Sequence, residues 1–321
     1  MKEKIRILVA EKSSFSERGL QAFAEIGPTE AFDLTQAELE SRVGEYELLV
    51  IRLGLQVNQA ILTRGNRLKG VATATTGTDH IDLAVAEKFK VAVLSLKGER
   101  QFLEGVYATA EHTFALLLCL IRHIPCAFEA VKNSVWRRDQ FRGIELHGKN
   151  LGIIGCGRLG TMVARYGVAF GMQTLAYDPY QPELPEGIER CWSLPDLLAR
   201  SDVVSLHVPL NVETRGMLGE AEFALMRPGA IVVNTARGAI IDEKALLRSL
   251  ETGHLGGAAL DVLAEEHKIG QETQPLIEYA RTHQNLIITP HIAGATYESV
   301  EKADLFLAKK VKEFFSNNFT T

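Results

Sequence analysis

Short apolar runs alternate with amphipathic segments along almost the whole chain. Before residue 100, the apolar runs predict strands at 5–10, 48–52, 71–75 and 91–96. After residue 150 they predict six more strands, at 151–154, 174–177, 203–207, 231–234, 257–260 and 286–289. Segments with helical spacing, such as 16–26, 83–89 and 108–121, lie between or beside these runs. Strands that alternate with helices are typical of α/β proteins with parallel sheets, and we predict this fold class.

One strand-to-helix turn carries a glycine pattern. Gly155, Gly157 and Gly160 have the spacing Gly-x-Gly-x-x-Gly, directly after the predicted strand 151–154 and before a helical segment. Such glycines permit a tight turn, let the backbone approach a pyrophosphate, and let the helix pack closely on the strand. The helix N-terminus then offers N–H groups to the phosphates. This turn therefore predicts a dinucleotide site.

The end of the next predicted strand indicates which dinucleotide binds. Asp178 follows that strand, where a carboxylate can bind the hydroxyls of the adenosine ribose. A carboxylate there repels a 2′-phosphate, and Pro179, Tyr180 and Gln181 follow it in place of an arginine or lysine. We predict NAD as the cofactor.

The position of the glycine turn divides the chain into two domains. The six strands from residue 151 onward match a doubly wound Rossmann domain, which we place at 101–290. The four earlier strands predict a smaller substrate-binding domain at 1–100. The amphipathic segment 298–315 can return to it, so this domain is predicted to be discontinuous and to include 291–321. A ligand site in a cleft between the two domains is expected.

Composition narrows the possible partners. The 321 residues are 46% hydrophobic and carry a formal net charge of −5, which gives no general attraction to nucleic acid or acidic lipid. The longest apolar stretch is too short to span a bilayer. Four cysteines without paired spacing, and an N-terminus that begins a strand rather than a signal peptide, favour a cytoplasmic protein.

Three polar side chains follow successive strands of the second set. Arg237, Glu266 and His291 are expected to converge, because ligands bind at the carboxyl ends of strands in open α/β sheets. Hydride transfer to a carbonyl needs a group that handles the hydroxyl proton, and histidine titrates in the right range. A guanidinium suits a carboxylate of the substrate. The histidines and cysteines show no spacing of metal ligands, so no metal is expected.

These motifs resemble the D-isomer-specific 2-hydroxyacid dehydrogenase family over essentially the whole chain. The matching segments are 77–82, 108–113, 147–160, 207–209, 234–238, 259–262 and 289–294, together with Arg52. The resemblance implies that Arg237 positions the substrate, that His291 is the acid/base and that Glu266 pairs with it. It also implies a hinge-closing cleft and a homodimer built through the NAD domain.

The same resemblance implies the remaining site residues. Cofactor contacts are expected at Thr76, Gly155, Gly157, Arg158, Leu159, Gly160, Asp178, Val208, Pro209, Thr235, Ala236, Asp261 and Gly294. Substrate contacts are expected at Arg52, Thr75, Gly77 and Arg138, of which Arg52 and Arg138 are candidates for a distal anionic group.

Three departures bear on the substrate. Glu266 is followed by His267 rather than proline, Thr75 replaces the first glycine of the carboxylate loop, and Thr73 stands where phosphoglycerate dehydrogenases carry an arginine. The last difference argues against 3-phosphoglycerate. The threonine-rich loop locally resembles erythronate-4-phosphate dehydrogenases.

The sequence predicts an NAD-dependent oxidoreductase that interconverts a D-2-hydroxy acid and its 2-oxo acid. The alternative is a catalytically weak, NAD(H)-sensing interaction protein, and a phosphonate-oxidising relative is a further possibility. Formate dehydrogenase is disfavoured, because its histidine pairs with a glutamine and here the partner is an acid.

Overall fold

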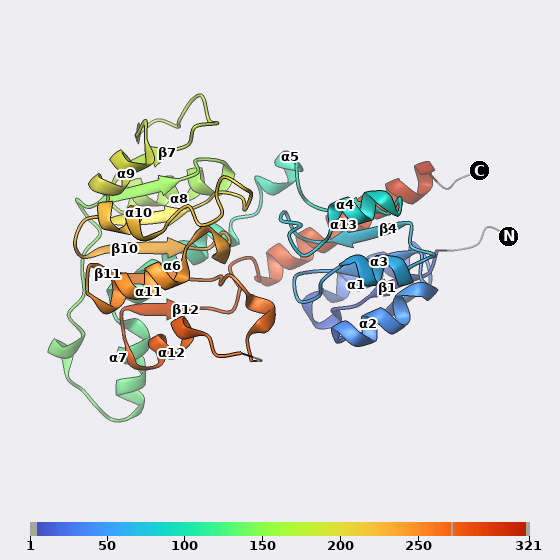
Figure 1. The fold of residues 1–321 in the computed structure, drawn as a ribbon, viewed down its shortest axis with the longest axis horizontal. Helices are drawn as coiled ribbons and strands as arrows, with labels where there is room; N and C mark the ends of the chain where they lie inside the picture. The colour runs from blue at the N-terminus through green and yellow to red at the C-terminus, as the bar shows by residue number, and fades with distance from the viewer. Residues whose placement is uncertain (1–4, 271, 319–321) are drawn as a thin grey trace. The chain divides into compact units, whose positions relative to one another are not determined.

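The computed structural model describes residues 5–270 and 272–318, and these form two compact units. The first unit runs to Val106 and resumes at Ala295, and the second runs from Tyr107 to Gly294 (Figure 1). The sequence placed these boundaries at 100/101 and 290/291. They differ because Phe102 stacks on Phe306 in the first unit, with 4.1 Å between the ring centroids. The backbone N–H groups after Pro290, in turn, are hydrogen-bonded within the second unit.

The first unit is a five-stranded parallel sheet of order β2-β1-β3-β4-β5. Its strands are β1 (Ile7–Val9), β2 (Thr29–Ala31), β3 (Leu48–Ile51), β4 (Gly70–Thr73) and β5 (Ala92–Leu94). Its helices are α1 (Glu17–Ala24), α2 (Gln36–Arg42), α3 (Gln59–Arg64), α4 (Leu83–Lys88), α5 (Arg100–Leu103) and α13 (Tyr297–Asn318), with short 3-10 turns at Lys12–Ser14 and Val43–Glu45. This is the flavodoxin-like strand order, in which the chain leaves β1 toward one side and returns to pair β3 on the other.

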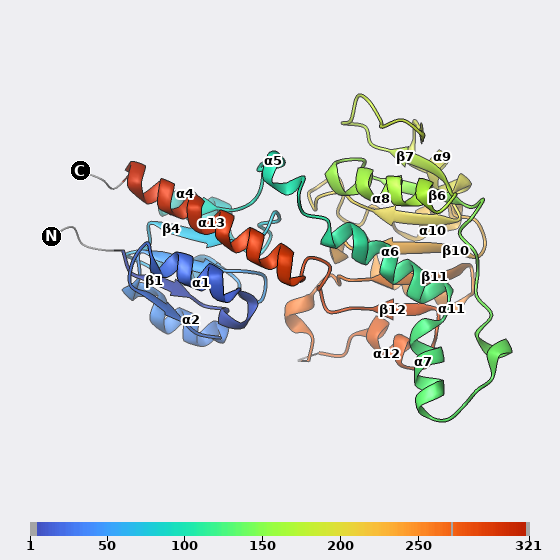
Figure 2. The ribbon, with the colours of Figure 1, turned by 180° about the vertical axis from the view of Figure 1, so that it is seen from behind.

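Alternation along the strands builds the two layers of this unit. Ile7, Val9 and Val50 face a core that includes side chains of α1 and α13. Leu8 and Leu49 point the other way, into a core with α2, α3 and α4. Both faces of a parallel sheet are thereby buried, which is why its strands read as continuous apolar runs. Figure 2 shows α13 lying along α1 over one face of the sheet.

The second unit is a seven-stranded parallel sheet of order β12-β11-β10-β9-β6-β7-β8. Its strands are β6 (Asn150–Ile154), β7 (Gln173–Tyr177), β8 (Ile188–Arg190), β9 (Val203–Leu206), β10 (Ala230–Asn234), β11 (Leu255–Leu260) and β12 (Leu286–Ile288). Its helices are α6 (Ala108–Ile121), α7 (Ile124–Lys132), α8 (Arg158–Ala169), α9 (Leu194–Arg200), α10 (Glu220–Leu225), α11 (Glu243–Glu251) and α12 (Pro275–Thr282), with 3-10 turns at Arg138–Phe141, Gly238–Ile240 and Glu266–Lys268. The chain passes from β6 to β7 on one side and to β9 on the other, so the switch point of the Rossmann sheet lies between β6 and β9.

The two edge strands β2 and β8 were not predicted. Their sequences, Thr-Glu-Ala and Ile-Glu-Arg, are half exposed and contain no apolar run. The prediction of six strands for the nucleotide domain was therefore one short within the described residues. The added strand leaves the switch point, and hence the predicted site, where it was.

Helices cover both faces of the second sheet as well. Leu197, Phe223 and Leu246 of α9, α10 and α11 pack in one core, and Phe114 and Val163 of α6 and α8 pack in the other. Figure 2 shows α6 and α8 together on one face. Within the described residues no single helix has the length and apolarity to cross a bilayer; α6 and α7 meet that test only as a pair, and the pair is bent by 62°.

Candidate active site

The glycine turn follows β6 at the switch point of the second sheet. Gly155 has a φ of +88°, and a Cβ there would lie 2.7 Å from Cγ1 of Val208. A Cβ on Gly160 would lie 2.0 Å from the carbonyl oxygen of Gly155. A Cβ on Gly157, in contrast, would meet no atom within 4 Å. The outer two glycines are thus required by packing, whereas the middle one faces open space, where a phosphate can approach the backbone at the start of α8.

Asp178 is held beside this turn. Its Oδ2 accepts a hydrogen bond from the N–H of Cys156 at 2.8 Å, and its Oδ1 accepts one from the N–H of Tyr180 at 2.9 Å. The carboxylate is half-buried, and these hydrogen bonds fix its orientation, as binding of ribose hydroxyls requires. The turn and this acid therefore fit an NAD molecule.

Arg190, which sequence reasoning missed, also lies next to Asp178. Its guanidinium donates to the carbonyl oxygens of Gln181 and Pro182 at 2.9 and 3.1 Å. It comes from β8, an edge strand that the apolar pattern did not reveal. Because its Nη2 is engaged with backbone oxygens, Arg190 braces the loop after Asp178.

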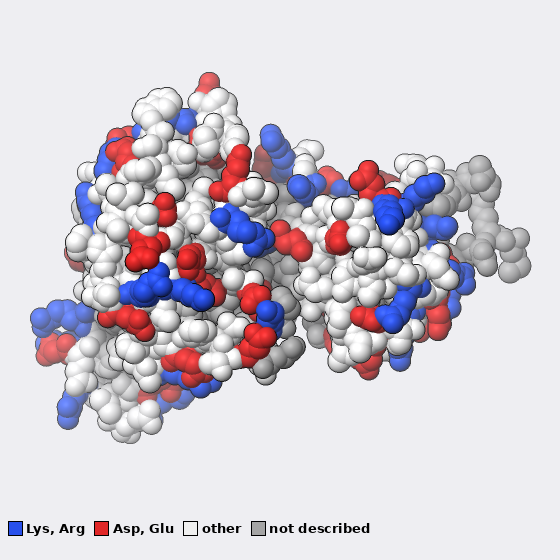
Figure 3. Space-filling model, in the orientation of Figure 1, with Lys and Arg blue, Asp and Glu red and all other residues white. Residues whose placement is uncertain are grey.

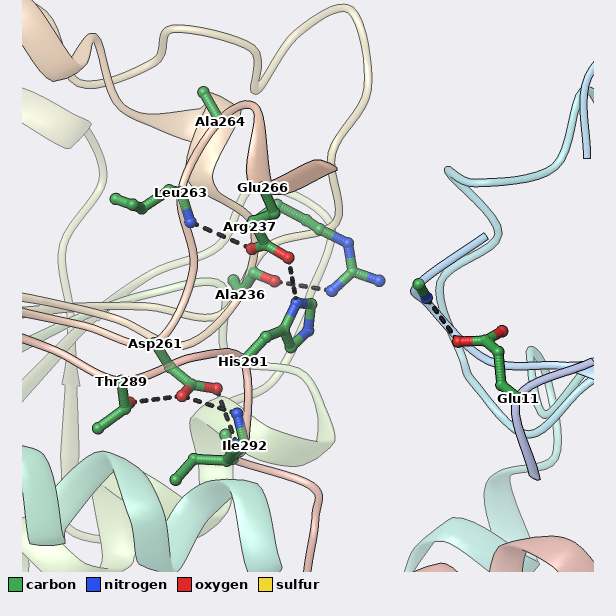
Figure 4. Close-up of polar contacts among 12 residues, drawn as sticks. Glu11, Ala236, Arg237, Asp261, Leu263, Ala264, Glu266, Thr289, His291 and Ile292 are labelled. Carbon is green, nitrogen blue, oxygen red and sulfur yellow. Dashed lines mark hydrogen bonds and ion pairs between the residues drawn. The ribbon is translucent and has the colours of Figure 1, made fainter. Parts of the chain in front are cut away.

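His291, Glu266 and Arg237 meet at the carboxyl end of the second sheet (Figure 4). His291 follows β12, Glu266 begins the turn Glu266–Lys268 after β11, and Arg237 follows β10. His291 Nδ1 lies 2.7 Å from Glu266 Oε2. The neighbouring Glu265 instead pairs with Lys268 at 2.8 Å.

The hydrogen bonds define which nitrogen of His291 can react. Glu266 accepts from the N–H of Leu263 through Oε1 at 3.1 Å and faces His291 through Oε2. A carboxylate can only accept here, so Nδ1 of His291 carries a proton and donates it. Nε2 is then the nitrogen that can exchange a proton with a substrate.

The backbone of His291 adopts a left-handed conformation. Its φ is +55°, which is uncommon for a residue other than glycine. Asp261 holds this turn: its Oδ1 accepts from the N–H of Ile292 at 2.9 Å, and its Oδ2 accepts from the N–H of Ala293 at 2.8 Å. Strained backbone of this kind persists where surrounding contacts enforce it.

Asp261 itself is fully enclosed. Thr289 Oγ1 donates to its Oδ1 at 2.5 Å, and His112 Nε2 lies 3.4 Å from the same oxygen. Burial alone would raise the pKa of Asp261, but hydrogen bonds from His112, Thr289 and the backbone outweigh it and lower the pKa. Asp261 thus lies beneath the His291 turn, where these hydrogen bonds stabilise its charged form. Its predicted contact with the cofactor stays a prediction.

Arg237 is placed by two neighbours. The side chain of Asn234 accepts from the N–H of Ala236 at 2.9 Å and donates to the carbonyl of Arg237 at 2.9 Å. A Cβ on Gly238 would lie 1.9 Å from the carbonyl carbon of Leu263, so only glycine fits behind the arginine. Asn234 belongs to the segment 234–238 that matches the family. The sequence alone does not show that its side chain holds the turn before Arg237 by hydrogen bonds.

The first unit holds the predicted substrate loop. Thr75 Oγ1 donates to the carbonyl of Gly77 at 2.6 Å and lies 2.9 Å from Thr73 Oγ1, which in turn lies 3.2 Å from Nε2 of the buried His80. Since the Thr75 hydroxyl donates to Gly77, it accepts from Thr73. This chain of hydrogen bonds fixes the loop after β4, and Thr76 lies exposed on it.

The remaining predicted cofactor residues lie near the switch point of the second sheet or after β10 and β12. Thr235 is buried. The others are half-buried or exposed: Arg158, Leu159, Val208, Pro209, Ala236 and Gly294. Arg138 lies elsewhere, in the segment 133–149 between α7 and β6, which we call the arm. Its side chain is 91% exposed and pairs with Asp139 at 3.6 Å. Figure 1 shows α7 and this arm near the end of the sheet where its strands begin. Within one chain, Arg138 is not brought to the His291 cluster.

His207 follows β9, and its Nε2 lies 2.8 Å from Oγ of Ser205. Burial lowers the pKa of His207 to about 3, so the ring stays neutral. Among residues 5–270 and 272–318, no group of three or more His, Cys, Asp or Glu side chains is arranged to hold a metal ion.

Comparisons with known proteins agree with this geometry. Residues 114–293 match the family model for the D-isomer specific 2-hydroxyacid dehydrogenase, NAD binding domain. The D-3-phosphoglycerate dehydrogenase of Methanocaldococcus jannaschii is 37% identical over 313 residues, which are 96% of this chain and 57% of that protein. The corresponding enzyme of Bacillus subtilis is 36% identical over 315 residues, 96% of this chain and 56% of that protein. The chain thus spans little more than half the length of these relatives.

Solved structures match over nearly their full length. D-lactate dehydrogenase from Aquifex aeolicus, complexed with NAD and lactic acid, has a TM-score of 0.82 and 31% identity, covering 98% of this chain and 96% of that one. An acyclic imino acid reductase in complex with NADPH and D-Arg has a TM-score of 0.81 and 27% identity, covering 98% of each chain.

Proposed function

Since this chain belongs to the D-isomer specific 2-hydroxyacid dehydrogenase family, we propose that it interconverts a D-2-hydroxy acid and its 2-oxo acid with NAD. The observation that supports this most strongly is the 2.7 Å contact between His291 and Glu266 beside Arg237. It supplies a proton-transfer group, its charge partner and an anion-binding guanidinium at the carboxyl end of one sheet.

In the reducing direction, Arg237 binds the carboxylate and the keto oxygen of the substrate. NADH, when bound, supplies the hydride that reduces the carbonyl carbon. Nε2 of His291 donates its proton to the oxygen as negative charge develops there, which general acid catalysis requires. Glu266 keeps Nδ1 protonated and so directs Nε2 at the reacting oxygen. In the oxidising direction His291 takes the proton back.

Stereochemistry tests this proposal. With NAD present, the purified protein is expected to form NADH from the D-enantiomer of its 2-hydroxy acid and not from the L-enantiomer. Equal use of both enantiomers would contradict the assignment.

The partner of His291 yields a separate prediction. Glu266→Gln is expected to lower kcat by about 10- to 100-fold, since a neutral amide no longer stabilises the imidazolium. Steady-state rates of the wild type and the variant under the same conditions check this. A variant with wild-type kcat would remove Glu266 from the proton transfer.

Asp178 determines the choice of cofactor. Asp178→Ser is expected to weaken NADH binding about tenfold and to raise the relative affinity for NADPH, because the repulsion of a 2′-phosphate disappears. Fluorescence titration with both cofactors measures the change. Asp196→Ser, at an exposed carboxylate of α9 in the same unit, is the matched control. If the ratio of the dissociation constants for NADH and NADPH is the same in the wild type and in Asp178→Ser, Asp178 does not discriminate between the two cofactors.

For the substrate, we propose that Thr75 and Gly77 bind its carboxylate with backbone groups of the loop after β4. Roles for Arg52 and Arg138 at a distal group were predicted on the same resemblance. The curated relatives act by name on phosphoglycerate, but here Thr73, not arginine, ends β4.

We propose that the enzyme is a homodimer assembled through the second unit. Large apolar side chains are exposed here: Phe128 of α7 is 63% exposed, and Trp136 of the arm is 86% exposed beside Arg137 and Arg142. Apolar and arginine-rich surfaces of this kind are typical of interfaces. Sedimentation at twice the mass of one chain supports the dimer, and a monomer at micromolar concentration contradicts it.

The NAD(H)-sensing alternative is not favoured, because the catalytic side chains are assembled and the relatives are dehydrogenases by name.

No nucleic-acid or membrane partner is proposed; on the face drawn in Figure 3, basic and acidic side chains are interspersed. We also place the protein in the cytoplasm, as free thiols persist in reducing compartments. Cell fractionation tests this.

A further inference from the structure

The first unit has its own topological switch point, at the carboxyl ends of β1 and β3. In its strand order the chain diverges from β1 to β2 on one side and to β3 on the other. Such switch points are where open α/β sheets bind ligands. Glu11 follows β1 and the segment 52–54 follows β3, so these residues lie at the switch point. The proposed carboxylate loop follows β4, the next strand along.

Backbone N–H groups at this switch point are already bound to the carboxylate of Glu11. Glu11 Oε2 accepts from the N–H of Arg52 at 2.6 Å, and its Oε1 accepts from the N–H of Gly54 at 2.7 Å. Figure 4 shows the Glu11 carboxylate turned toward a backbone nitrogen. A Cβ on Gly54 would lie 2.7 Å from Oε1, so the loop closes tightly on the acid. Adjacent N–H groups that could hold a phosphate or carboxylate of a ligand therefore hold Glu11.

The guanidinium of Arg52, at the same switch point, is also bound to a side chain of the protein. Arg52 Nη2 lies 2.5 Å from Oδ1 of Asp304, which is wholly buried in α13. Oδ2 of Asp304 accepts from the N–H and the hydroxyl of Ser16 at 2.8 and 2.9 Å. The guanidinium lies over the ring of Phe15, and its Nε is buried. Removing Arg52 from Asp304 would leave a buried charge uncompensated, which is strongly unfavourable.

Two carboxyl groups, Glu11 and Asp304, and one guanidinium, that of Arg52, lie at this switch point. Burial raises the pKa of Glu11, and hydrogen bonds from Arg52 and Gly54 together with the charge of Arg52 oppose that rise. The end of β4 adds the hydroxyls of Thr73 and Thr75. A distal phosphate or carboxylate placed here would meet an anion and find the local donors occupied.

We propose that Glu11 is a specificity-determining residue that excludes 2-oxo acids with a distal phosphate or carboxylate, so that the substrate carries an uncharged side chain. This inference rests on the proposed function. Arg52, predicted to bind a distal anion, here joins the loop after β3 to α13 through its ion pair with Asp304.

Paired substrates test the proposal. Hydroxypyruvate and 3-phosphohydroxypyruvate differ only by the phosphate, and wild-type protein is expected to reduce the first with a kcat/KM at least about tenfold higher. Glu11→Gln is expected to lower that ratio at least about fivefold, since the repelling charge is removed. Glu25→Gln, at an exposed carboxylate of the same unit, is the matched control and is expected to keep the wild-type ratio.

The outcomes separate the two proposals. Equal or better turnover of the phosphorylated acid by wild-type protein overturns the inference while leaving the dehydrogenase assignment intact. An unchanged ratio in a folded Glu11→Gln protein, checked by its melting temperature, also overturns it. If that variant does not fold, the wild-type ratio alone decides. Failure of every 2-oxo acid despite NADH binding contradicts the proposed function, and the inference falls with it.

Discussion

Replacement of His291 by alanine is expected to lower kcat for reduction of the 2-oxo acid by about 10³-fold while NADH still binds. General acid catalysis by a placed side chain contributes about 10²–10⁴-fold, and here one ring nitrogen is fixed by Glu266 at 2.7 Å. The hydrogen bonds of His291 go to Glu266, Asp261 and Thr289, so loss of the ring is expected to leave the glycine turn intact.

Stopped-flow single-turnover rates and NADH fluorescence titration measure the two effects separately. His147→Ala, at an exposed histidine of the same unit, is the matched control and is expected to keep the wild-type rate. A His291→Ala rate within about tenfold of wild type would mean that another group donates the proton.

Arg237→Lys is expected to lower kcat/KM by about 10²- to 10³-fold. Lysine keeps the charge but loses the planar fork that binds a carboxylate and a keto oxygen together. Misplacement of the reacting carbonyl lowers kcat as well as raising KM, because proximity to both the hydride and Nε2 is lost. Arg237→Ala is expected to lose more, since truncation removes the charge too.

Steady-state kinetics on both variants check this prediction, with Arg215→Lys at an exposed arginine as the control. A change confined to KM, with kcat unaltered, would indicate that Arg237 only helps to bind the substrate. A variant with wild-type kcat/KM would remove Arg237 from the site.

Much of the catalytic cluster was predictable because parallel sheets order their ends. Arg237, Glu266 and His291 each follow a strand, and strands β10, β11 and β12 are neighbours, so their loops meet without long-range information. The glycine turn was predictable from its local spacing, since packing requires Gly155 and Gly160 and Gly157 leaves open space beside the backbone.

The edges and the supports of the fold were not predictable in the same way. Strands β2 and β8 are short and half exposed, so they lack the apolar run that marks a buried strand. The ion pair of Arg52 with Asp304 joins residues 252 positions apart, and no local pattern encodes it. Glu11 reaches the loop after β3 only because the topology places β1 beside β3.

The most direct test of the account is NADH oxidation by the purified protein with a panel of 2-oxo acids, run in parallel with His291→Ala. The account predicts rapid oxidation with one or more unphosphorylated acids by the wild type and about 10³-fold slower oxidation by the variant. Demonstrated NADH binding without oxidation by any acid, or equal rates for the two proteins, would contradict it.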